Sequence, residues 1–461
     1  MLQAFHSSVL KGIVGEDNFY DDKAHLLAYS YDATREHYEP ECIVYPKDEE
    51  TVSGVLKFCN EHKISVIARG AGSGFTGGAL PVRGGVILAM EKYFNQILEI
   101  DEKNLIARVQ PGVVNKHFQE EVEKIGLFYP PDPASQEYST LGGNVSENAG
   151  GMRAAKYGIT KDYVMALRAV LPNGDIIRAG KKTIKDVAGY NIAGILIASE
   201  GSLAVITEIT LKLIAKPKLK KSAMGVFPDI QSAMNAVYKT MSSGIVPVAM
   251  EFLDNLTIKA VEERFHKGLP VEAGAILITQ VDGDILEQIS WQLQRIEERF
   301  QENGCIHFKV AQNEQEEADL WFARRNASQS ITIYGKKKLN EDITVPRSRL
   351  PDLLEKISEV SKKYGFKIPC FGHTGDGNVH TNVMVPNPDD KTQLEKGYQA
   401  IEEIFKITVG LEGTLSGEHG IGLSKAPFMP LAFTSSEMEL FRNIKKAFDP
   451  NNILNPGKMG L

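Results

Sequence analysis

The feature that most constrains the fold is a run of five glycines in ten residues, Arg69-Gly-Ala-Gly-Ser-Gly-Phe-Thr-Gly-Gly78. The run follows an apolar stretch, Ile64–Ala68, that is typical of a short strand, and it contains the spacing G-x-G-x-x-G. A Rossmann unit requires a helix that opens at such a loop and an acidic residue about 20 residues further on. Pro81, Gly84 and Gly85 break any helix here, and the next strand begins almost at once. The run therefore argues against a Rossmann unit and predicts a loop whose backbone N–H groups bind phosphate oxygens.

Composition places the chain among soluble globular proteins of two or three domains. It has 461 residues, 43% hydrophobic and 24% charged, and a net charge of 52 − 59 = −7. No basic footprint for nucleic acid is visible. The four cysteines form no CxxC pair, so we expect free thiols and no iron–sulfur cluster or zinc ribbon held by this chain alone. No signal peptide and no apolar stretch of about 20 residues is found. We therefore expect a cytoplasmic protein without a transmembrane segment, and peripheral attachment to the inner face of the cell membrane stays open.

The chain divides into three regions of different texture. Residues 1–217 are rich in glycine and short strands, such as Gly85–Met90 and Ala204–Leu213, and the basic stretch Ala215–Lys221 is expected to be a linker. Residues 218–415 alternate strands with long helical patterns, which predicts an antiparallel sheet with helices on one face. Residues 416–461 return to glycine-rich turns and end in one more helix. The expected helices are Asp229–Ser243, Leu286–Gln301, Arg349–Tyr364, Asp390–Leu411 and Ser435–Phe448.

Further glycine-rich segments lie between strands in the first region. They are Pro130-Pro-Asp-Pro133, Leu141–Gly151 with Lys156-Tyr-Gly158, and Lys185–Tyr190 with Ser199–Glu208. Small residues at these points let a flat ligand lie against the backbone. Together with the first loop, they predict one extended binding site.

The strongest chemical signal is Gly372-His-Thr-Gly-Asp-Gly-Asn-Val-His380-Thr-Asn382. Its glycines make a helix costly, at roughly 1 kcal/mol each relative to alanine. Asp376-Gly377 is instead a hairpin signal, with one strand ending near His373 and another starting near His380. Alternation along the second strand places His380 and Asn382 on one face. Two imidazoles and one carboxamide can therefore converge on one spot.

A second motif, Ser416-Gly-Glu-His-Gly-Ile-Gly422, carries Glu418 and His419 between glycines. Two histidines and one glutamate form a three-ligand set with open positions, which is typical of a catalytic metal. Zn²⁺, Mn²⁺ and Fe²⁺ all accept imidazole and carboxylate. Arg324, in Leu320-Trp-Phe-Ala-Arg-Arg325, is a candidate for binding a carboxylate, although its sequence alone favours an ordinary helix-surface arginine.

These motifs, in this order and spacing, resemble the vanillyl-alcohol-oxidase superfamily, and within it the FAD-linked D-2-hydroxy-acid dehydrogenases, the D-lactate dehydrogenase and glycolate oxidase flavin-subunit type. The resemblance runs from about Pro40 to Leu454-Asn-Pro-Gly-Lys458. It implies an α+β fold: a PCMH-type (p-cresol methylhydroxylase-type) FAD-binding domain of two α+β subdomains, plus a ferredoxin-like antiparallel-sheet cap domain for the substrate. It assigns residues 1–217 to the FAD domain, 218–415 to the cap, and 416–461 to a C-terminal segment that returns to the FAD domain.

The resemblance also implies a set of cofactor-binding residues. In that family the loop matching 69–78 holds the pyrophosphate, and the segments matching 131–158 and 199–206 contact the rest of the FAD. The glycine loop carries no histidine, so we expect non-covalent FAD. The expected set is Arg69, Gly70, Ala71, Gly72, Ser73, Gly74, Thr76, Gly77, Pro131, Asp132, Thr140, Gly142, Gly143, Asn144, Ser146, Asn148, Gly151, Tyr157, Gly158, Glu200, Gly201, Val205, Ile206 and Asn455.

The family's metal ligands match His373, His380 and Glu418, and its catalytic histidine matches His419. The resemblance also favours Arg324 over Arg325 as the carboxylate anchor, and we assign Asn382 a substrate contact. One departure concerns a substrate-contacting lysine that some members carry before a stretch matching Asp342-Ile-Thr-Val-Pro346. Here its equivalent is Asn340, with Lys338 nearby. A second cation for a dicarboxylate is thus in doubt, which favours a monocarboxylic acid over 2-hydroxyglutarate.

The sequence thus predicts FAD-dependent oxidation of a D-2-hydroxy acid, D-lactate or glycolate, to the 2-keto acid. A divalent metal, with Zn²⁺ favoured over Mn²⁺ and Fe²⁺, assists proton abstraction. Electrons would pass to a quinone, an iron–sulfur subunit or an electron-transferring flavoprotein; a homodimer stays open. The alternatives are metal-independent oxidation of an alcohol or sugar, D-2-hydroxyglutarate dehydrogenase, a metal hydrolase without redox role, and a non-catalytic electron relay. The D preference comes from the resemblance alone.

Overall fold

The computed structural model describes residues 2–461, and the chain forms two compact units. Unit 1 comprises the residues up to Gly150, Ile159–Lys216 and Glu418–Leu461. Unit 2 comprises Gly151–Gly158 and Pro217–Gly417. Each unit therefore contains segments that are distant in sequence.

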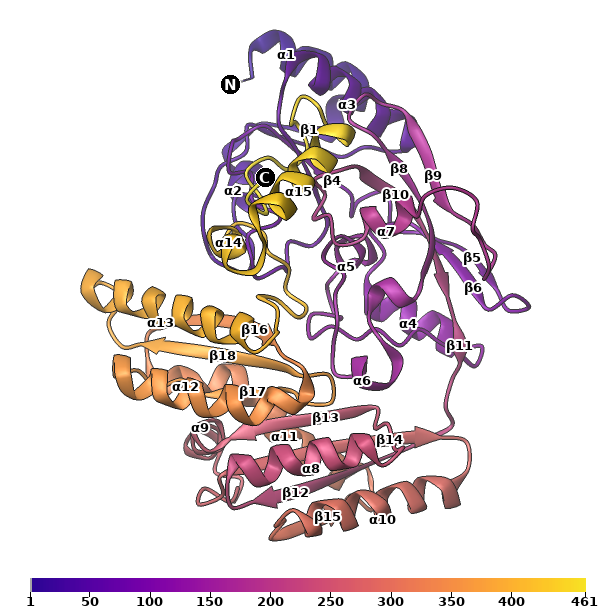
Figure 1. Ribbon diagram of the computed structural model, residues 1–461. Helices are drawn as coiled ribbons and strands as arrows, with labels where there is room; N and C mark the ends of the chain where they lie inside the picture. Colours follow the sequence, from indigo (N-terminus) through magenta and orange to yellow (C-terminus); the bar gives the residue numbers. More distant parts are fainter. Residues whose placement is uncertain (1) are drawn as a thin grey trace. The chain divides into compact units, whose positions relative to one another are not determined.

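The first part of unit 1 is a four-stranded sheet of order β1-β2-β4-β3, in which β2, β4 and β3 run parallel. Strands β1 and β4 of this sheet are labelled in Figure 1. The glycine loop leaves the carboxyl end of β3, an edge where open α/β sheets usually bind ligands. Asp48 accepts a hydrogen bond from Thr51 N at 2.8 Å and so caps the helix that precedes β3. The elements are α1 (Ala4–Val14), β1 (Phe19–Tyr20), α2 (Lys23–Ala28), β2 (Cys42–Val44), α3 (Glu49–His62), β3 (Val66–Arg69) and β4 (Val86–Ala89).

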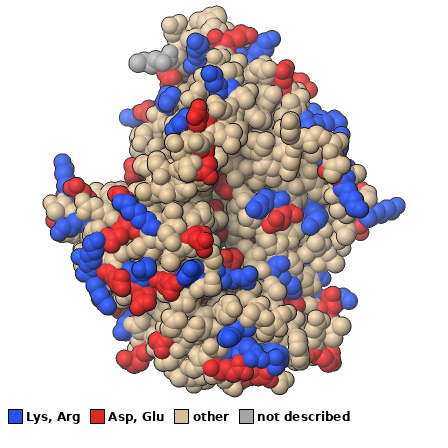
Figure 2. Space-filling model, viewed as in Figure 1, with Lys and Arg blue, Asp and Glu red and all other residues tan. Residues whose placement is uncertain are grey.

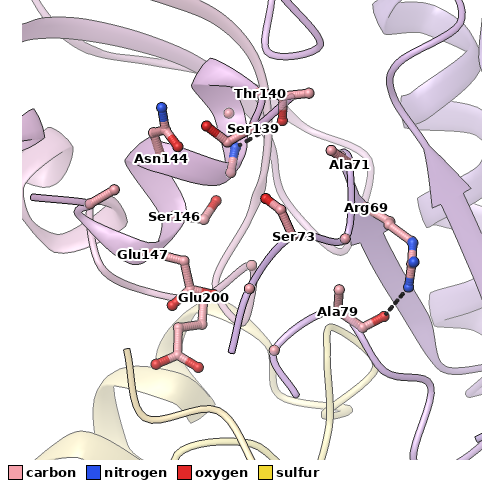
Figure 3. Close-up of a pocket in the computed structure, with 18 of the residues that line it drawn as sticks. Arg69, Ala71, Ser73, Ala79, Ser139, Thr140, Asn144, Ser146, Glu147 and Glu200 are labelled. Carbon is pink, nitrogen blue, oxygen red and sulfur yellow. Dashed lines mark hydrogen bonds between the residues drawn. The ribbon is translucent and has the colours of Figure 1, made fainter. Parts of the chain in front are cut away.

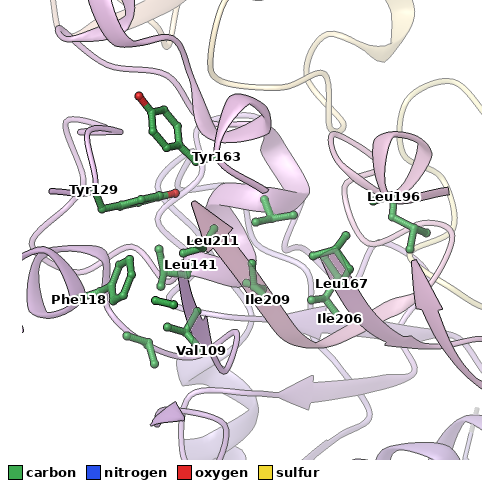
Figure 4. Packing of buried hydrophobic residues seen from close by; sticks show 14 of the residues in the cluster. Val109, Phe118, Tyr129, Leu141, Tyr163, Leu167, Leu196, Ile206, Ile209 and Leu211 are labelled. Atoms are coloured by element: carbon green, nitrogen blue, oxygen red, sulfur yellow. The ribbon is translucent and has the colours of Figure 1, made fainter. Parts of the chain in front are cut away.

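The second part of unit 1 is a five-stranded antiparallel sheet of order β5-β6-β10-β8-β9. Its core, shown in Figure 4, packs Phe118 of α4 and Leu141 of α5 against buried strand residues such as Ile209. This packing fixes α5, whose first residues reach the candidate site. The elements are β5 (Ile97–Asp101), β6 (Ile106–Val109), α4 (Asn115–Glu123), β7 (Leu127–Phe128), α5 (Leu141–Glu147), β8 (Val164–Val170), β9 (Ile176–Gly180), α7 (Ile192–Leu196), β10 (Val205–Lys212) and β11 (Ile214–Ala215).

The C-terminal segment completes unit 1. It contains α14 (Met429–Ala432) and α15 (Ser435–Phe448), and its last residues lie beside β3. Val66 N donates to Ile453 O at 2.8 Å, and Asn455 N donates to Val66 O at 2.9 Å. The end of the chain is thus bound to the strand that carries the glycine loop.

Unit 2 is built on a seven-stranded antiparallel sheet of order β15-β12-β14-β13-β17-β18-β16. Its strands are β12 (Leu219–Phe227), β13 (Ala249–Asp254), β14 (Ala275–Gly283), β15 (His307–Val310), β16 (Lys337–Thr344), β17 (Cys370–His373) and β18 (Asn378–Val385). Its helices are α6 (Ala154–Tyr157), α8 (Ile230–Ser242), α9 (Asn255–Phe265), α10 (Leu286–Glu302), α11 (Glu314–Ser330), α12 (Leu350–Tyr364) and α13 (Lys391–Gly410).

Two expectations about unit 2 are wrong. Helices cover both faces of the sheet rather than one, because successive residues of β12 face opposite sides: Val226 packs in a cluster with Trp321 of α11, while Gly225 faces Phe300 of α10. The basic stretch Ala215–Lys221 is not all linker either. Its last three residues begin β12, which pairs with β14 from Leu219 onward. Lysines suit this strand start because their side chains stay at the surface.

The surface charges, the cysteines and the helix lengths bear on the remaining expectations from sequence. On the face shown in Figure 2, acidic and basic side chains are intermixed rather than gathered into one basic field. All four cysteines are free, three of them buried and Cys305 half-buried. Burial raises the pKa of the Cys59 thiol to about 12, so this thiol stays protonated at neutral pH. Among residues 2–461, no helix combines the length and the apolar character needed to cross a bilayer.

Candidate functional site

A large cleft in unit 1 collects most of the residues expected to bind the cofactor (Figure 3). It encloses about 1240 Å³ of space outside the protein atoms, open solvent at its mouth included. Fifteen of the expected residues line it: Arg69, Gly70, Ala71, Gly72, Ser73, Gly74, Thr140, Gly142, Gly143, Asn144, Ser146, Glu200, Gly201, Val205 and Ile206. Three chain segments, one after β3, one around α5 and one leading into β10, therefore meet around one site.

Nine of the expected residues are not part of this lining. Gly151, Tyr157 and Gly158 lie in unit 2, where the Tyr157 hydroxyl donates to Asp282 Oδ2 at 2.7 Å. The Asn455 side chain buttresses the cleft by donating to Gly78 O at 2.8 Å and Glu200 O at 2.7 Å. The others are Thr76, Gly77, Pro131, Asp132 and Asn148.

The lining also contains residues outside the expected set, although ten of them lie in the segments 69–78, 131–158 and 199–206 that were expected to contact the cofactor. They are Ala68, Phe75, Gly78, Ala79, Met90, Pro111, Pro133, Ala134, Ser135, Ser139, Glu147, Ala149, Gly150 and Ala204. Most are direct neighbours of expected residues, so adjacency in the three motifs was the available signal. Met90 and Pro111 carried none, because only the tertiary fold places them at the cleft.

The glycine loop has its conformation because a buried arginine lies behind it. Arg69 is 6% exposed, and its guanidinium donates to Tyr31 O at 2.7 Å and to Ala79 O at 3.3 Å. A Cβ on Gly70 would collide with Thr140, and one on Gly72, whose φ is +66°, would lie 2.7 Å from Cζ of Arg69. Arg69 thus shapes the loop from inside and places a positive charge behind backbone N–H groups, which suits a phosphate ligand.

The Glu418–His419 segment enters the same cleft. Both residues line it, with side chains 12% and 15% exposed, and the ring of His419 lies 5.3 Å from that of Phe75, centre to centre. A Cβ on Gly150 would lie 3.2 Å from Glu418 Oε2, so the glycine leaves room for this carboxylate. Thr76 holds the segment through a 3.2 Å hydrogen bond from its hydroxyl to His419 O.

Glu200 anchors the backbone that follows His419. Its two carboxylate oxygens accept from Ile421 N and Gly422 N, each at 2.7 Å. Burial raises the pKa of Glu200, and these N–H groups and Lys458 oppose the rise. Burial likewise lowers the pKa of Lys458 to about 8, against the attraction of Glu200 and Asp32. Two buried groups of opposite charge, Glu200 and Lys458, therefore lie behind the cleft wall.

The histidine motif of unit 2 forms the expected hairpin. Strands β17 and β18 pair antiparallel, with His373 opposite Asn378 and Phe371 opposite His380. His380 is therefore the diagonal neighbour of His373 on the same face of the sheet. Their Nε2 atoms lie 3.4 Å apart, and both side chains are almost fully buried. The predicted convergence of the two imidazoles is what the hairpin produces.

A buried carboxylate that sequence reasoning missed lies beside the pair. Glu251 of β13 is the direct cross-strand partner of His373, and its Oε1 lies 2.7 Å from His373 Nδ1. Its Oε2 accepts from Arg324 Nε at 2.6 Å. Arg324 is thus largely shielded, with 13% of its side chain exposed, rather than placed on the open helix surface, and its guanidinium lies over Phe371. A lone glutamate in an apolar strand is a signal that sequence reasoning could have used.

Asn382 and Asp342 hold the backbone around the histidines. Asn382 is fully buried, and its amide donates to Pro369 O and His380 O at 3.2 Å each. Asp342, the cross-strand partner of His380 in β16, accepts from Gly417 N at 2.9 Å. The next residue along the chain is Glu418, one Cα–Cα step of about 3.8 Å away. Gly417 ends unit 2, and Glu418 and His419 belong to unit 1.

The residues present fit both groups that the sequence motifs imply. An elongated cleft with glycine backbone along one wall and a buried arginine behind it suits the diphosphate of a flavin dinucleotide. Two imidazole Nε2 atoms that face each other, one with its Nδ1 hydrogen-bonded to a carboxylate, form the usual arrangement of metal-binding histidines.

Fold and cleft together define a flavin-binding oxidoreductase, and comparison with known proteins gives its family. Residues 40–180 match the FAD binding domain, and residues 216–459 match the C-terminal domain of FAD linked oxidases. The chain belongs to the FAD-linked oxidases, which confirms the resemblance and the PCMH-type fold expected from sequence.

Among curated relatives, glycolate oxidase subunit GlcD of Bacillus subtilis is 41% identical over 97% of this chain and 95% of its own length. D-lactate dehydrogenase of Anaerostipes hadrus is 32% identical, covering 100% of this chain and 97% of the relative. D-2-hydroxyglutarate dehydrogenase of Stutzerimonas stutzeri is 30% identical over 98% of this chain and 97% of its own length. These similarities support FAD-linked oxidation of hydroxy acids.

Among solved structures, p-cresol methylhydroxylase with bound substrate superposes with a TM-score of 0.80 over 99% of this chain and 96% of that chain. The identity is 19%, so this likeness supports the fold alone.

Proposed function

We propose that the chain oxidises a D-2-hydroxy acid, D-lactate or glycolate, to the 2-keto acid at a metal-assisted site and passes the electrons to an acceptor other than NAD. The observation that carries the proposal is the buried His373–His380 pair with facing Nε2 atoms. The names of the relatives, glycolate oxidase subunit and D-lactate dehydrogenase, support this substrate class.

We assign the metal to His373, His380 and Glu418. Asp342 is the cross-strand neighbour of His380 and binds the backbone of Gly417, the residue that precedes Glu418 in the chain. The metal, when bound, supplies a Lewis acid for the substrate hydroxyl, and Zn²⁺ suits this ligand set best, with Mn²⁺ and Fe²⁺ as alternatives.

We assign the proton transfer to His419, which lines the cofactor cleft and follows Glu418 directly. His419 removes the hydroxyl proton as the carbonyl forms; a positioned base of this kind contributes typically about 10²- to 10⁴-fold to the rate. FAD bound in the cleft without a covalent link would supply the acceptor for the Cα hydrogen and its two electrons. The remaining residues of the cleft position the cofactor and exclude water.

We assign the substrate carboxylate to Arg324. Its Nε is taken by Glu251, and among the described residues no hydrogen bond occupies its two Nη groups, which leaves them for a carboxylate. Lys338, the cation nearest to Asn340 in sequence, donates to Ser328 Oγ at 2.8 Å. This contact favours a monocarboxylate over 2-hydroxyglutarate. The amide nitrogen of Asn382 donates to backbone, whereas its buried Oδ1 accepts no hydrogen bond from the described residues, and we assign the substrate contact of Asn382 to that oxygen.

The acceptor is proposed to be a quinone, an iron–sulfur subunit or an electron-transferring flavoprotein, met in the cytoplasm or at the inner membrane face. The subunit status in the name of the Bacillus subtilis relative supports a protein partner.

A panel of D- and L-2-hydroxy acids, scored by anaerobic bleaching of the flavin absorbance and combined with elemental analysis, tests the proposal. D-lactate or glycolate should bleach the flavin in protein that contains about one metal ion per chain, and bleaching should stop after chelation. Bleaching by an alcohol or sugar in metal-free protein would support the metal-independent alternative instead. Protein without a flavin spectrum would favour a hydrolase.

A further inference from the structure

Glu251 has no role in the proposed chemistry, although its surroundings are unusual. It is a fully buried carboxylate at the middle of a seven-stranded sheet, where an uncompensated charge would be strongly disfavoured. Both of its oxygens are used: Oε1 by His373 Nδ1 at 2.7 Å and Oε2 by Arg324 Nε at 2.6 Å. One carboxylate thus connects a proposed metal ligand to the proposed substrate anchor.

The bond to His373 determines which ring nitrogen carries the proton. Because a carboxylate only accepts, His373 Nδ1 holds the hydrogen, and the lone pair stays on Nε2. That lone pair points toward His380 Nε2, 3.4 Å away. An outer carboxylate of this kind raises the basicity of a ligating imidazole and fixes its ring orientation.

The bond to Arg324 determines how its guanidinium presents itself. The contact at Nε fixes one edge of the planar group, and Phe371 lies under its face with the guanidinium carbon 5.1 Å from the ring centre. The free edge is then the Nη pair, which has the geometry to bind both oxygens of a carboxylate. Phe371 is also the cross-strand partner of His380, so these two side chains, Arg324, Glu251 and His373 all share one region of the sheet.

We propose that Glu251 is a positioning residue that sets the offset between the metal ligand and the carboxylate anchor. This proposal rests on the proposed function. In a 2-hydroxy acid the hydroxyl and the carboxylate are on adjacent carbons, so their two binding groups must keep a fixed separation. A single rigid carboxylate bonded to both supplies it, and Glu251 thereby favours 2-hydroxy over 3-hydroxy acids.

The test compares Glu251→Gln with Asp254→Asn as a matched control. Asp254 is a second buried carboxylate on β13, and it bonds Thr257 N at 2.7 Å and Cys370 N at 2.8 Å rather than the histidine or Arg324. Metal is removed from the FAD-loaded full chain, and Zn²⁺ affinity is measured by competition with a chromophoric chelator. Glu251→Gln should weaken Zn²⁺ binding by about 10- to 100-fold and raise KM, whereas Asp254→Asn should leave Zn²⁺ affinity unchanged.

A third variant separates the effect of the Glu251–His373 bond from the effect of the Glu251–Arg324 bond. Arg324→Lys leaves the Glu251–His373 bond in place, so Zn²⁺ affinity should stay at the wild-type value while KM rises and the preference for 2-hydroxy over 3-hydroxy acids falls. Wild-type Zn²⁺ affinity in Glu251→Gln would overturn the positioning role and leave the proposed function standing. Absence of Zn²⁺ binding by the wild-type chain would overturn both. An equal loss of affinity in Asp254→Asn would reduce Glu251 to a general stabilising role.

Discussion

Gly422→Ala is the substitution for which the structure gives the most detailed expectation. Gly422 has a φ of +51°, and its N–H donates to Glu200 at 2.7 Å. A Cβ at this position would lie 2.6 Å from Thr76 Oγ1 and 2.7 Å from the Thr76 carbonyl carbon. Since backbone is the obstacle, the segment that carries His419 must move.

The magnitude follows from these contacts. An alanine in the left-handed region costs roughly 1–2 kcal/mol, and loss of a hydrogen bond to a charged group costs about 1.5–3 kcal/mol. We therefore expect the free energy of unfolding to fall by about 2.5–5 kcal/mol. His419 is three residues away, and a displacement of about 1 Å at reacting groups can cost about 100-fold in rate. A loss of about 10- to 100-fold in flavin reduction is expected.

The assay is stopped-flow flavin reduction by D-lactate or glycolate under anaerobic conditions, together with urea unfolding of the same preparation. Gly12→Ala is the control within the same unit, because Gly12 lies in α1 and a Cβ there would meet nothing within 4 Å. It should leave the rate unchanged and stability unchanged or slightly raised. Wild-type values for Gly422→Ala in both measurements would refute the account of how Glu200 and Thr76 hold this segment.

Three further outcomes are expected. His419→Asn should retain the yellow FAD spectrum but reduce the rate of anaerobic flavin bleaching by about 100-fold or more; wild-type bleaching would remove His419 as the base. Glu418→Gln should lower metal content and activity together, and an unchanged metal content by elemental analysis would remove it from the ligand set. Burial raises the pKa of Asp254 to about 6 from an ordinary value of 3.8, so the folded state binds the extra proton between these values. The free energy of unfolding of the wild type should therefore fall by roughly 3 kcal/mol between pH 3 and pH 7 relative to Asp254→Asn and stay level above pH 7. Parallel pH dependences of urea unfolding for the two proteins would contradict this.

Local elements were predictable because their signals are local. Helix α15 spans Ser435–Phe448, as periodicity predicted, and the other expected helices differ from the observed ones by one residue at one or both ends. The histidine hairpin followed from Asp376-Gly377 and strand alternation, which depend on few neighbouring residues. The prediction that Ala215–Lys221 is a linker was wrong for its last three residues. Composition suggested a linker, but these residues pair with the distant strand β14 and belong to β12.

Other features required the folded chain. Nothing near Arg324 in the sequence shows that its side chain is buried against Glu251, because 73 residues separate the two. The anchoring of Ile421 and Gly422 by Glu200 spans more than 200 residues. Such pairs form when strands and loops are brought together by packing, which no short pattern records.

The sequence by itself determined the chemical inventory: glycine-lined backbone for a diphosphate, two imidazoles seven residues apart, and an acid–histidine pair between glycines. Those depend on residue type and local backbone preference. Only the tertiary structure decided how each group is held, since Arg69 turned out to support its loop from behind and Glu251 to connect two expected site residues. The reason is physical: buried charges need partners, and in this fold the partners come from distant strands.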